Sequence, residues 1–170
     1  MSEQILVVDH QKLTYEGLFN AAEVYNIVSS WFFDRNWDWI ENLNEEQVTP
    51  DGKQVRIYLQ PWKSISTFYK LTMNIKLHMH NIREVEVEHE GKKVNLHQGM
   101  IQITVDGHVH ADRQDEMVGR PFFWFLTIMM HKYFYKTYQS KASDWIRSDV
   151  DDMLNMLKNY LNNYKYSYRY

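Results

Sequence analysis

Residues 71–80 read LTMNIKLHMH, and this stretch decides the fold because apolar and polar side chains alternate strictly along it. The odd positions from Leu71 to Met79 are all apolar, whereas the even positions from Thr72 to His80 are all polar. A period of two places successive side chains on opposite faces of a β-strand. The stretch therefore predicts a strand with one buried face and one wet face, as in an antiparallel sheet.

The same alternation predicts strands before this stretch. We expect a first strand within Ile5–Phe19 and two further strands at Gln47–Thr49 and Gln54–Gln60. Pro50-Asp51-Gly52 joins the last two as a turn, since Pro presets φ and Gly accepts the positive φ that follows. Pro61-Trp62-Lys63 is expected to end the strand before the decisive stretch begins.

Two more strands are expected after the decisive stretch, which Asn81 ends. Val85 and Val87 alternate with glutamates, Glu90-Gly91 forms a hairpin turn, and lysines begin the return strand. Opposite charges that face each other across a hairpin are favourable, so this acidic stripe is interpreted as a solvated face. The final strand contains Ile101, Ile103 and Val105.

Helical periodicity frames these strands. Asn20 is expected to cap a helix, with Glu23 completing a capping box and Val24, Ile27, Val28 and Trp31 on one apolar face. A second short helix is expected over Asn36–Leu43, with Trp37, Ile40 and Leu43 on one side.

The C-terminal third is also expected to be helical, over Phe122–Tyr138 and again after a Ser143 cap. An apolar stripe along the last helix consists of Ile146, Val150, Met153, Leu154, Leu157, Leu161 and Tyr164.

Composition indicates one globular α+β domain spanning residues 1–170. Apolar residues make up 44% of the 170 residues, charged residues 24% and aromatic residues 15%. The net charge of −3 offers no basic face for nucleic acid, so no nucleic-acid partner is expected. There is no cysteine, which excludes disulfides and thiolate metal sites. The N-terminus lacks a signal-peptide pattern and the longest apolar run is too short for a membrane span, so a cytoplasmic location is expected.

This order of elements resembles the helix-grip fold of the START-like superfamily, which includes polyketide cyclases, plant pathogenesis-related allergens and lipid-transfer domains. The resemblance rests on Leu13–Phe19, Asn20–Leu43, the alternating strands and Ser143–Tyr164. It implies a curved antiparallel sheet, two short helices after the first strand and a long C-terminal helix. The superfamily has no invariant catalytic residues, and the glycine-rich loop of its plant members is absent here.

The resemblance also implies a cavity between sheet and C-terminal helix that binds a hydrophobic small molecule or lipid. Met73, Ile75, Leu77, Ile101 and Ile103 would form its floor, Met153, Leu154 and Leu157 its lid, and Tyr15, Trp31, Tyr58 and Trp62 its polar tips. The same side chains could instead fill an ordinary core, in which Met plugs irregular gaps. No cofactor and no catalysis are assigned on this interpretation, because neither a Gly-x-Ser-x-Gly motif nor a nucleotide-binding glycine loop is present.

Histidines provide an alternative, a histidine-ligated metalloenzyme. His78 and His80 share one strand face, as do His108 and His110. If the two strands were neighbours, four imidazoles would converge near Asp106 or Asp112, and zinc accepts such ligands. Both pairs fall on the polar face, however, which favours plain solvent exposure.

The third alternative is an interaction module. Residues 117–147 interleave basic and aromatic side chains, a composition that suits contact with a membrane surface. The same segment would serve equally as the contact surface of a homodimer or pack against the sheet.

Overall fold

A computed structural model describes residues 2–66, 69–89, 91–112, 129 and 136–167 of the chain. Over this part the protein has an α+β fold, with an antiparallel sheet and a long C-terminal helix. In chain order the elements are β1 (Ser2–Phe19), α1 (Ala21–Asp34), β2 (Asp38–Thr49), β3 (Gly52–Ser64), β4 (Tyr69–His89), β5 (Lys92–Asp112) and α3 (Lys136–Ser167).

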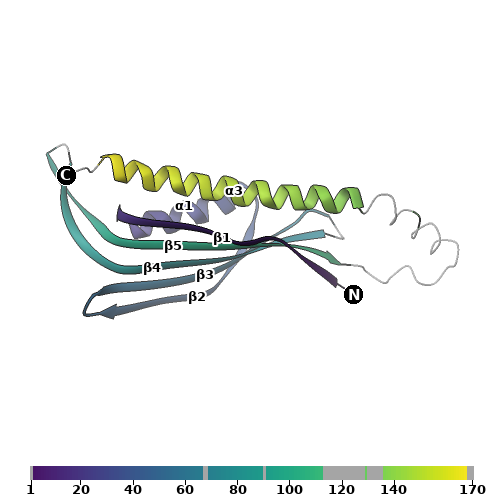
Figure 1. The fold of residues 1–170 in the computed structure, drawn as a ribbon, viewed down its shortest axis with the longest axis horizontal. Helices are drawn as coiled ribbons and strands as arrows, with labels where there is room; N and C mark the ends of the chain where they lie inside the picture. Colours follow the sequence, from purple (N-terminus) through teal and green to yellow (C-terminus); the bar gives the residue numbers. More distant parts are fainter. Residues whose placement is uncertain (1, 67–68, 90, 113–128, 130–135, 168–170) are drawn as a thin grey trace.

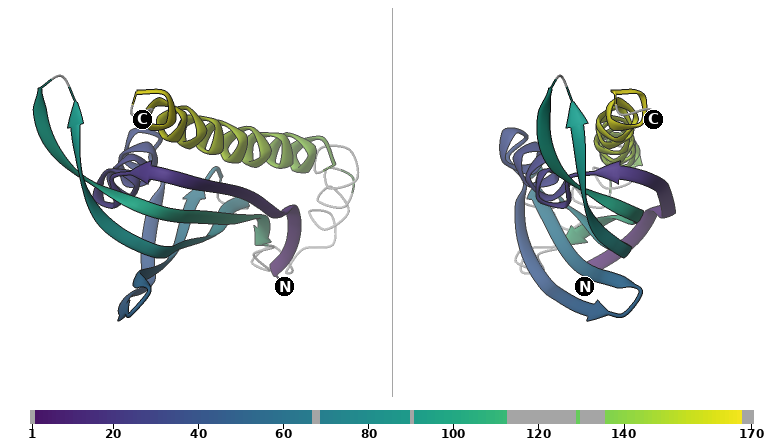
Figure 2. Two further views of the ribbon diagram at one scale, coloured as in Figure 1. Left: turned by 60° about the vertical axis from the view of Figure 1, so that its left-hand side comes forward. Right: turned by 90° about the vertical axis from the view of Figure 1, so that its left-hand side faces the viewer.

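The sheet is five-stranded, with the order β1-β5-β4-β3-β2 and antiparallel pairing throughout. Strands β2 to β5 follow one another as hairpins. Strand β5 also pairs with β1, so the first strand of the chain forms one edge of the same sheet. Both helices lie on the same side of the sheet, and α3 runs along it (Figure 1). Figure 2 shows the sheet curving, with the β4–β5 hairpin bent out of the plane of the other strands.

The decisive stretch lies at the centre of β4, as predicted. Its odd-numbered side chains from Leu71 to Met79 are all buried, and they join the inner face of β5 and the apolar stripe of α3 in one core. The α3 stripe from Ile146 to Leu161 is confirmed as buried. Tyr164, one turn further, packs on a second cluster around Leu96 in the β4–β5 hairpin.

Helix α1 is bounded by two asparagines. Asn20 accepts hydrogen bonds from the backbone N–H groups of Ala22 and Glu23, so it caps the helix as predicted. At the other end Asn36 has φ 56°, and Trp37 N–H donates to Phe32 O at 2.9 Å. A residue in the left-handed region, followed by a hydrogen bond that spans six residues, is the Schellman motif that commonly ends helices.

The predicted second helix over Asn36–Leu43 is wrong, because the chain enters β2 directly after that stop. The spacing of Trp37, Ile40 and Leu43 imitates a helix face, yet Ile40 is 58% exposed. Pairing with β3 decides the outcome, since Asp38 lies opposite Trp62 and the register continues to Thr49 opposite Gly52. Cross-strand pairing has overridden a weak local periodicity.

Three predicted boundaries are also wrong. Pro61 does not end β3, which continues to Ser64. Asn81 does not end β4; it sits at φ 53° in an irregularity of register between His80 and Arg83, and the strand continues to His89. Ser143 does not cap α3, which already begins at Lys136, and its hydroxyl donates to Gln139 O inside the helix.

The turn at Pro50–Gly52 and the hairpin pairing of His89 with Lys92 are confirmed. Most of the helix expected over Phe122–Tyr138 lies outside the described residues. Neither described helix contains a stretch long and apolar enough to cross a membrane.

Candidate functional site

Most of the side chains predicted to line a cavity are brought together in the core under α3. They are each no more than 2% exposed and belong to one cluster: Met73, Ile75, Leu77, Ile101, Ile103, Met153, Leu154 and Leu157. The floor and lid of the predicted site therefore touch as ordinary core neighbours in this structure.

Two of the predicted polar tips lie elsewhere. Tyr58 and Trp62 are on the opposite, polar face of the sheet, where Tyr58 Oη lies 3.2 Å from His78 Nε2 and the Lys70 ammonium lies 4.2 Å from the Trp62 ring. The structure separates these two side chains from the apolar set. Tyr15 packs against that set, opposite Ile101, and its hydroxyl donates a hydrogen bond to Leu18 O at 2.9 Å.

Trp31, the fourth polar tip, lines a groove between α1 and α3. The groove has a volume of about 310 Å³. Its α1 wall consists of Glu23, Asn26, Ile27, Ser30, Trp31 and Asp34, and Met156 contributes from α3. Ile27, Trp31 and Met156 also pack in or against the main core, so the apolar interior reaches the surface in this groove.

One end of this groove is fixed by a network around Trp31. Its indole Nε1 donates to Asp152 Oδ2 at 3.1 Å, and the Arg35 guanidinium stacks 4.8 Å from its ring. Arg35 also pairs with Asp152 at 2.5 Å and with Asp149 at 3.4 Å. Burial raises the pKa of the Asp149 carboxyl, and the neighbouring Arg35 partly offsets this effect.

The other end is fixed by Glu23. Its Oε2 accepts hydrogen bonds from Tyr160 Oη at 2.5 Å and Tyr164 Oη at 2.7 Å, which ties the start of α1 to the end of α3. Burial, and next the bond to Glu23, raises the pKa of the Tyr160 phenol far above its usual range. Tyr160 therefore stays a donor to Glu23, and its ring lies against that of Tyr164, with centroids 5.1 Å apart.

The four histidines do not converge, although β4 and β5 are neighbours. His78 lies opposite Gln102, whereas His108 lies opposite Thr72. Six positions along β4 separate His78 from Thr72, which is about 20 Å at a strand's rise per residue. Within each pair the rings do lie close, with centroids 6.0 Å apart for His78–His80 and 6.3 Å for His108–His110.

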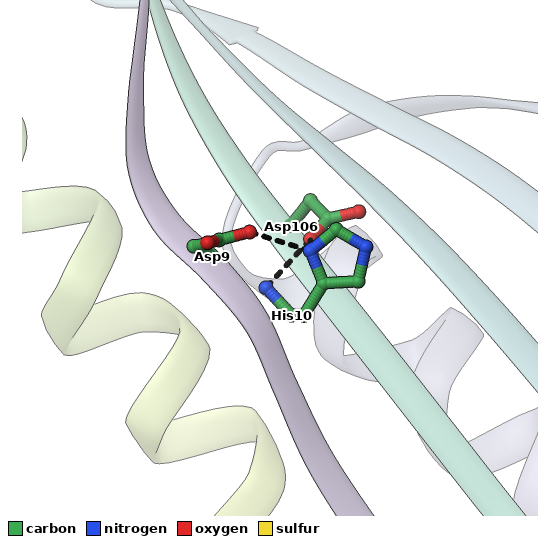
Figure 3. Close-up of side chains that lie close together, drawn as sticks. All are labelled: Asp9, His10 and Asp106. Carbon is green, nitrogen blue, oxygen red and sulfur yellow. Dashed lines mark hydrogen bonds and ion pairs between the residues drawn. The ribbon is translucent and has the colours of Figure 1, made fainter.

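A different cluster forms where β1 bulges against β5. The register between the strands shifts on both sides of Val8, and His10 adopts φ 46°. This bulge brings Asp9 and His10 over Asp106 (Figure 3). His10 Nδ1 lies 2.5 Å from Asp9 Oδ1 and 3.2 Å from Asp106 Oδ1, and the His10 backbone N–H donates to the same Asp106 oxygen at 2.7 Å.

This cluster combines one buried carboxylate with two exposed groups. The side chain of Asp106 is 12% exposed, against 63% for His10. The ligand atoms of all three residues lie within 4.8 Å of one another, and imidazole with carboxylate is a donor set that transition metals accept. Asp106 also has a structural role without any ion, because its hydrogen bond from the His10 backbone N–H stabilises the bulge in β1.

Sequence reasoning missed Asp9 and His10 because a bulge leaves no periodic signal, and it had placed Asp106 beside the histidine pairs instead. It also missed Glu23 and Met156 as groove residues. Their place depends on how α1 crosses α3, which local spacing does not encode. The segment 117–147 was expected to contact a membrane, contact a second subunit or pack against the sheet. Of its described residues, Ala142 and Ile146 lie in the core and Tyr138 packs against it, whereas residues 117–128 and 130–135 lie outside the described part of the chain.

No protein-family model matches this sequence, and no curated protein matches it either.

Proposed function

We propose that this protein binds a hydrophobic small molecule or lipid, the class of ligand that the resemblance to helix-grip proteins implies. The observation that carries the proposal is the groove between α1 and α3, whose apolar side chains are continuous with the core. Its volume of about 310 Å³ falls at the lower end of the range for small-molecule sites. Apolar walls with a few polar groups are the usual make-up of such sites.

The groove is a better place for the ligand than the interior between sheet and helix. The interior side chains from Met73 to Leu157 already pack against one another, so a ligand there would have to displace α3. In the groove, an alkyl or ring system contacts Ile27, Trp31 and Met156 without such a displacement. We also propose that the chain is START-like, and we assign it no catalytic activity.

A titration with the neutral fluorescent probe N-phenyl-1-naphthylamine tests the proposal. We expect saturable binding by the natural chain. Ile27→Glu is expected to weaken binding about tenfold or more, because a carboxylate cannot lose its water in an apolar groove without cost. Phe33→Glu is the matched control, since Phe33 is on the same helix, 76% exposed and outside the groove.

The control is expected to bind the probe like the natural chain. Circular dichroism of each variant establishes that α1 is intact. Absence of saturable binding by the natural chain, or an equal loss in both variants, would contradict a site in this groove.

As a second function we propose that Asp9, His10 and Asp106 bind a divalent transition-metal ion. Donor atoms at adjacent positions around one ion, with bonds of about 2.1 Å, lie about 3 Å apart. The 3.2 Å between His10 Nδ1 and Asp106 Oδ1 fits that spacing, whereas His10 Nδ1 and Asp9 Oδ1 lie 2.5 Å apart, so Asp9 has to move outward to bind the same ion. Among the ion pairs of the described residues, Asp106 pairs with His10 alone, so no lysine or arginine there already neutralises this buried carboxylate.

Calorimetric titration with Zn²⁺ tests this second function. Asp106→Asn keeps an oxygen that accepts from the His10 N–H but removes the charge, and we expect it to weaken Zn²⁺ binding about tenfold or more. The double variant His78→Gln, His80→Gln serves as control and should leave this site unchanged. Equal Zn²⁺ affinity in the Asp106 variant and the natural chain would show that the cluster only supports the bulge.

A further inference from the structure

We propose that the ligand of the α1–α3 groove carries a positively charged polar group, as in an alkylammonium compound, rather than a carboxylate. This inference rests on the proposed function and specifies the chemical class of the ligand. It follows from the charged side chains that line the groove, which are carboxylates at both ends.

The lining itself is acidic. Of the seven side chains that line the groove, Glu23 and Asp34 are carboxylates, and none is lysine or arginine. They lie at opposite ends of the α1 wall, with Asn26, Ile27, Ser30 and Trp31 between them. An anionic ligand would therefore meet a like charge at whichever end its polar group reached, whereas a cation is attracted at both.

The cation beside Trp31 is already engaged. Arg35 stacks on the Trp31 ring and pairs with both Asp149 and Asp152 of α3. Arg35 and Lys63, whose ammonium donates to Arg35 O at 2.8 Å, together balance the two acids, so these four side chains add no net positive charge to this end of the groove. A ligand carboxylate would have to compete with two protein carboxylates for the same guanidinium.

Glu23 is positioned to receive a cation at the other end. Both tyrosine hydrogen bonds reach its Oε2, and they hold the carboxylate in one orientation. A carboxylate accepts at both oxygens, so Oε1 can accept from a ligand N–H while Oε2 keeps its tyrosines.

Three probes with the same ten-carbon chain separate the charge of the polar group from the apolar contact. Decylammonium, decanoate and uncharged decyl glucoside are titrated by calorimetry below their micelle concentrations. We expect decylammonium to bind tightest and decanoate weakest. The preference for decylammonium should shrink as salt is added, since exposed charges are screened.

Charge-neutral variants identify the residues responsible. Glu23→Gln and Asp34→Asn are each expected to weaken decylammonium binding about two- to fivefold, as for one exposed ion pair, and to weaken decyl glucoside binding by a smaller factor. Glu88→Gln, an equal change of net charge in the distant β4–β5 hairpin, is the control and should alter neither.

The outcomes distinguish this inference from the function beneath it. The proposed positive charge is overturned if decanoate binds as tightly as decylammonium, or if Glu23→Gln and Glu88→Gln weaken decylammonium binding equally. In either case, saturable binding of decyl glucoside would still support a ligand site in the groove. If none of the three probes binds saturably, the proposed function itself fails.

Discussion

At the scale of single residues, the fold depends on side chains that cap a helix end or fill the core. Asn20 is an example, because its oxygen accepts from two N–H groups that the first turn of α1 leaves without helical partners. Leu157 is another, because it lies fully buried between α3 and the sheet. Each gives a prediction with a matched control on an exposed helix face.

Asn20→Ala is expected to lower the free energy of unfolding by about 1 kcal/mol, since the capping bonds are lost. Asn155→Ala, an exposed helical position on α3, should not lower it, because alanine is the better helix former there. Urea denaturation followed by circular dichroism compares the two variants. A smaller loss at Asn20 than at Asn155 would contradict the role of Asn20 as a cap.

Leu157→Ala is expected to lower the free energy of unfolding by about 2–5 kcal/mol, because the substitution removes buried carbon and leaves a cavity. Lys158→Ala, the next residue and exposed, should change it by less than about 0.5 kcal/mol. Equal stabilities for the two variants in the same urea titration would show that α3 is not packed on the sheet through this stripe.

At the scale of elements, β4 continues through a bulge because two glycines make room for it. A β-carbon added at Gly99 would lie 2.8 Å from His80 O, and one added at Gly52 would lie 2.9 Å from the carbonyl carbon of Asn81. Both are backbone atoms, which cannot swing aside. The bulge thus lets the neighbouring strands approach Asn81 closely where the sheet bends.

Gly99→Ala is expected to destabilise the protein by about 1–3 kcal/mol, the cost of forcing extra atoms into a filled place. Gln98→Ala is the neighbouring control, with an exposed side chain and a much smaller expected effect. Thermal unfolding of both variants provides the comparison. An unchanged melting temperature for Gly99→Ala would mean that the strands separate at the bulge with little cost.

Long periodic elements could be predicted from the sequence, whereas their ends and crossings could not. The alternation in β4, the cap at Asn20 and the stripe of α3 each carry a repeated local signal. The end of α1 at Asn36 and the bulge at His10 each depend on one residue with left-handed backbone angles, and such a residue leaves no periodic pattern in the sequence. For the same reason Trp31 could be expected at a ligand site, while Asp9, His10, Glu23 and Met156 required the tertiary arrangement.

At the scale of the whole molecule, the two faces of the sheet differ in their response to acid. The inner face is apolar core, whereas the outer face carries the histidine pairs. Burial, then His80 and nearby basic residues, lowers the pKa of His78; burial, then His108 and Lys70, lowers the pKa of His110. Protonation of either histidine is therefore less favourable in the folded protein than in the unfolded chain.

The sign of the pH dependence follows from these directions. Above the unfolded pKa of about 6.5 both states are neutral, and the histidines have no effect on stability. Below it the unfolded chain takes up the proton first, so stability falls. The double variant His78→Gln, His110→Gln should therefore lose less stability than the natural chain between about pH 7.5 and pH 5 in urea titrations. An identical loss in both proteins would contradict the lowered pKa values.

The central claim for the whole molecule is that a ligand binds in the groove between α1 and α3. Nuclear magnetic resonance tests this claim most directly. Decyl glucoside is added to isotope-labelled protein, and the six tryptophan indole N–H signals are followed. The groove predicts a saturable shift of the Trp31 signal and of the Ile27 and Met156 methyl signals, while Trp62 on the opposite face stays unchanged. Shifts centred on Trp62, or no saturable shift at Trp31, would contradict a ligand site between α1 and α3.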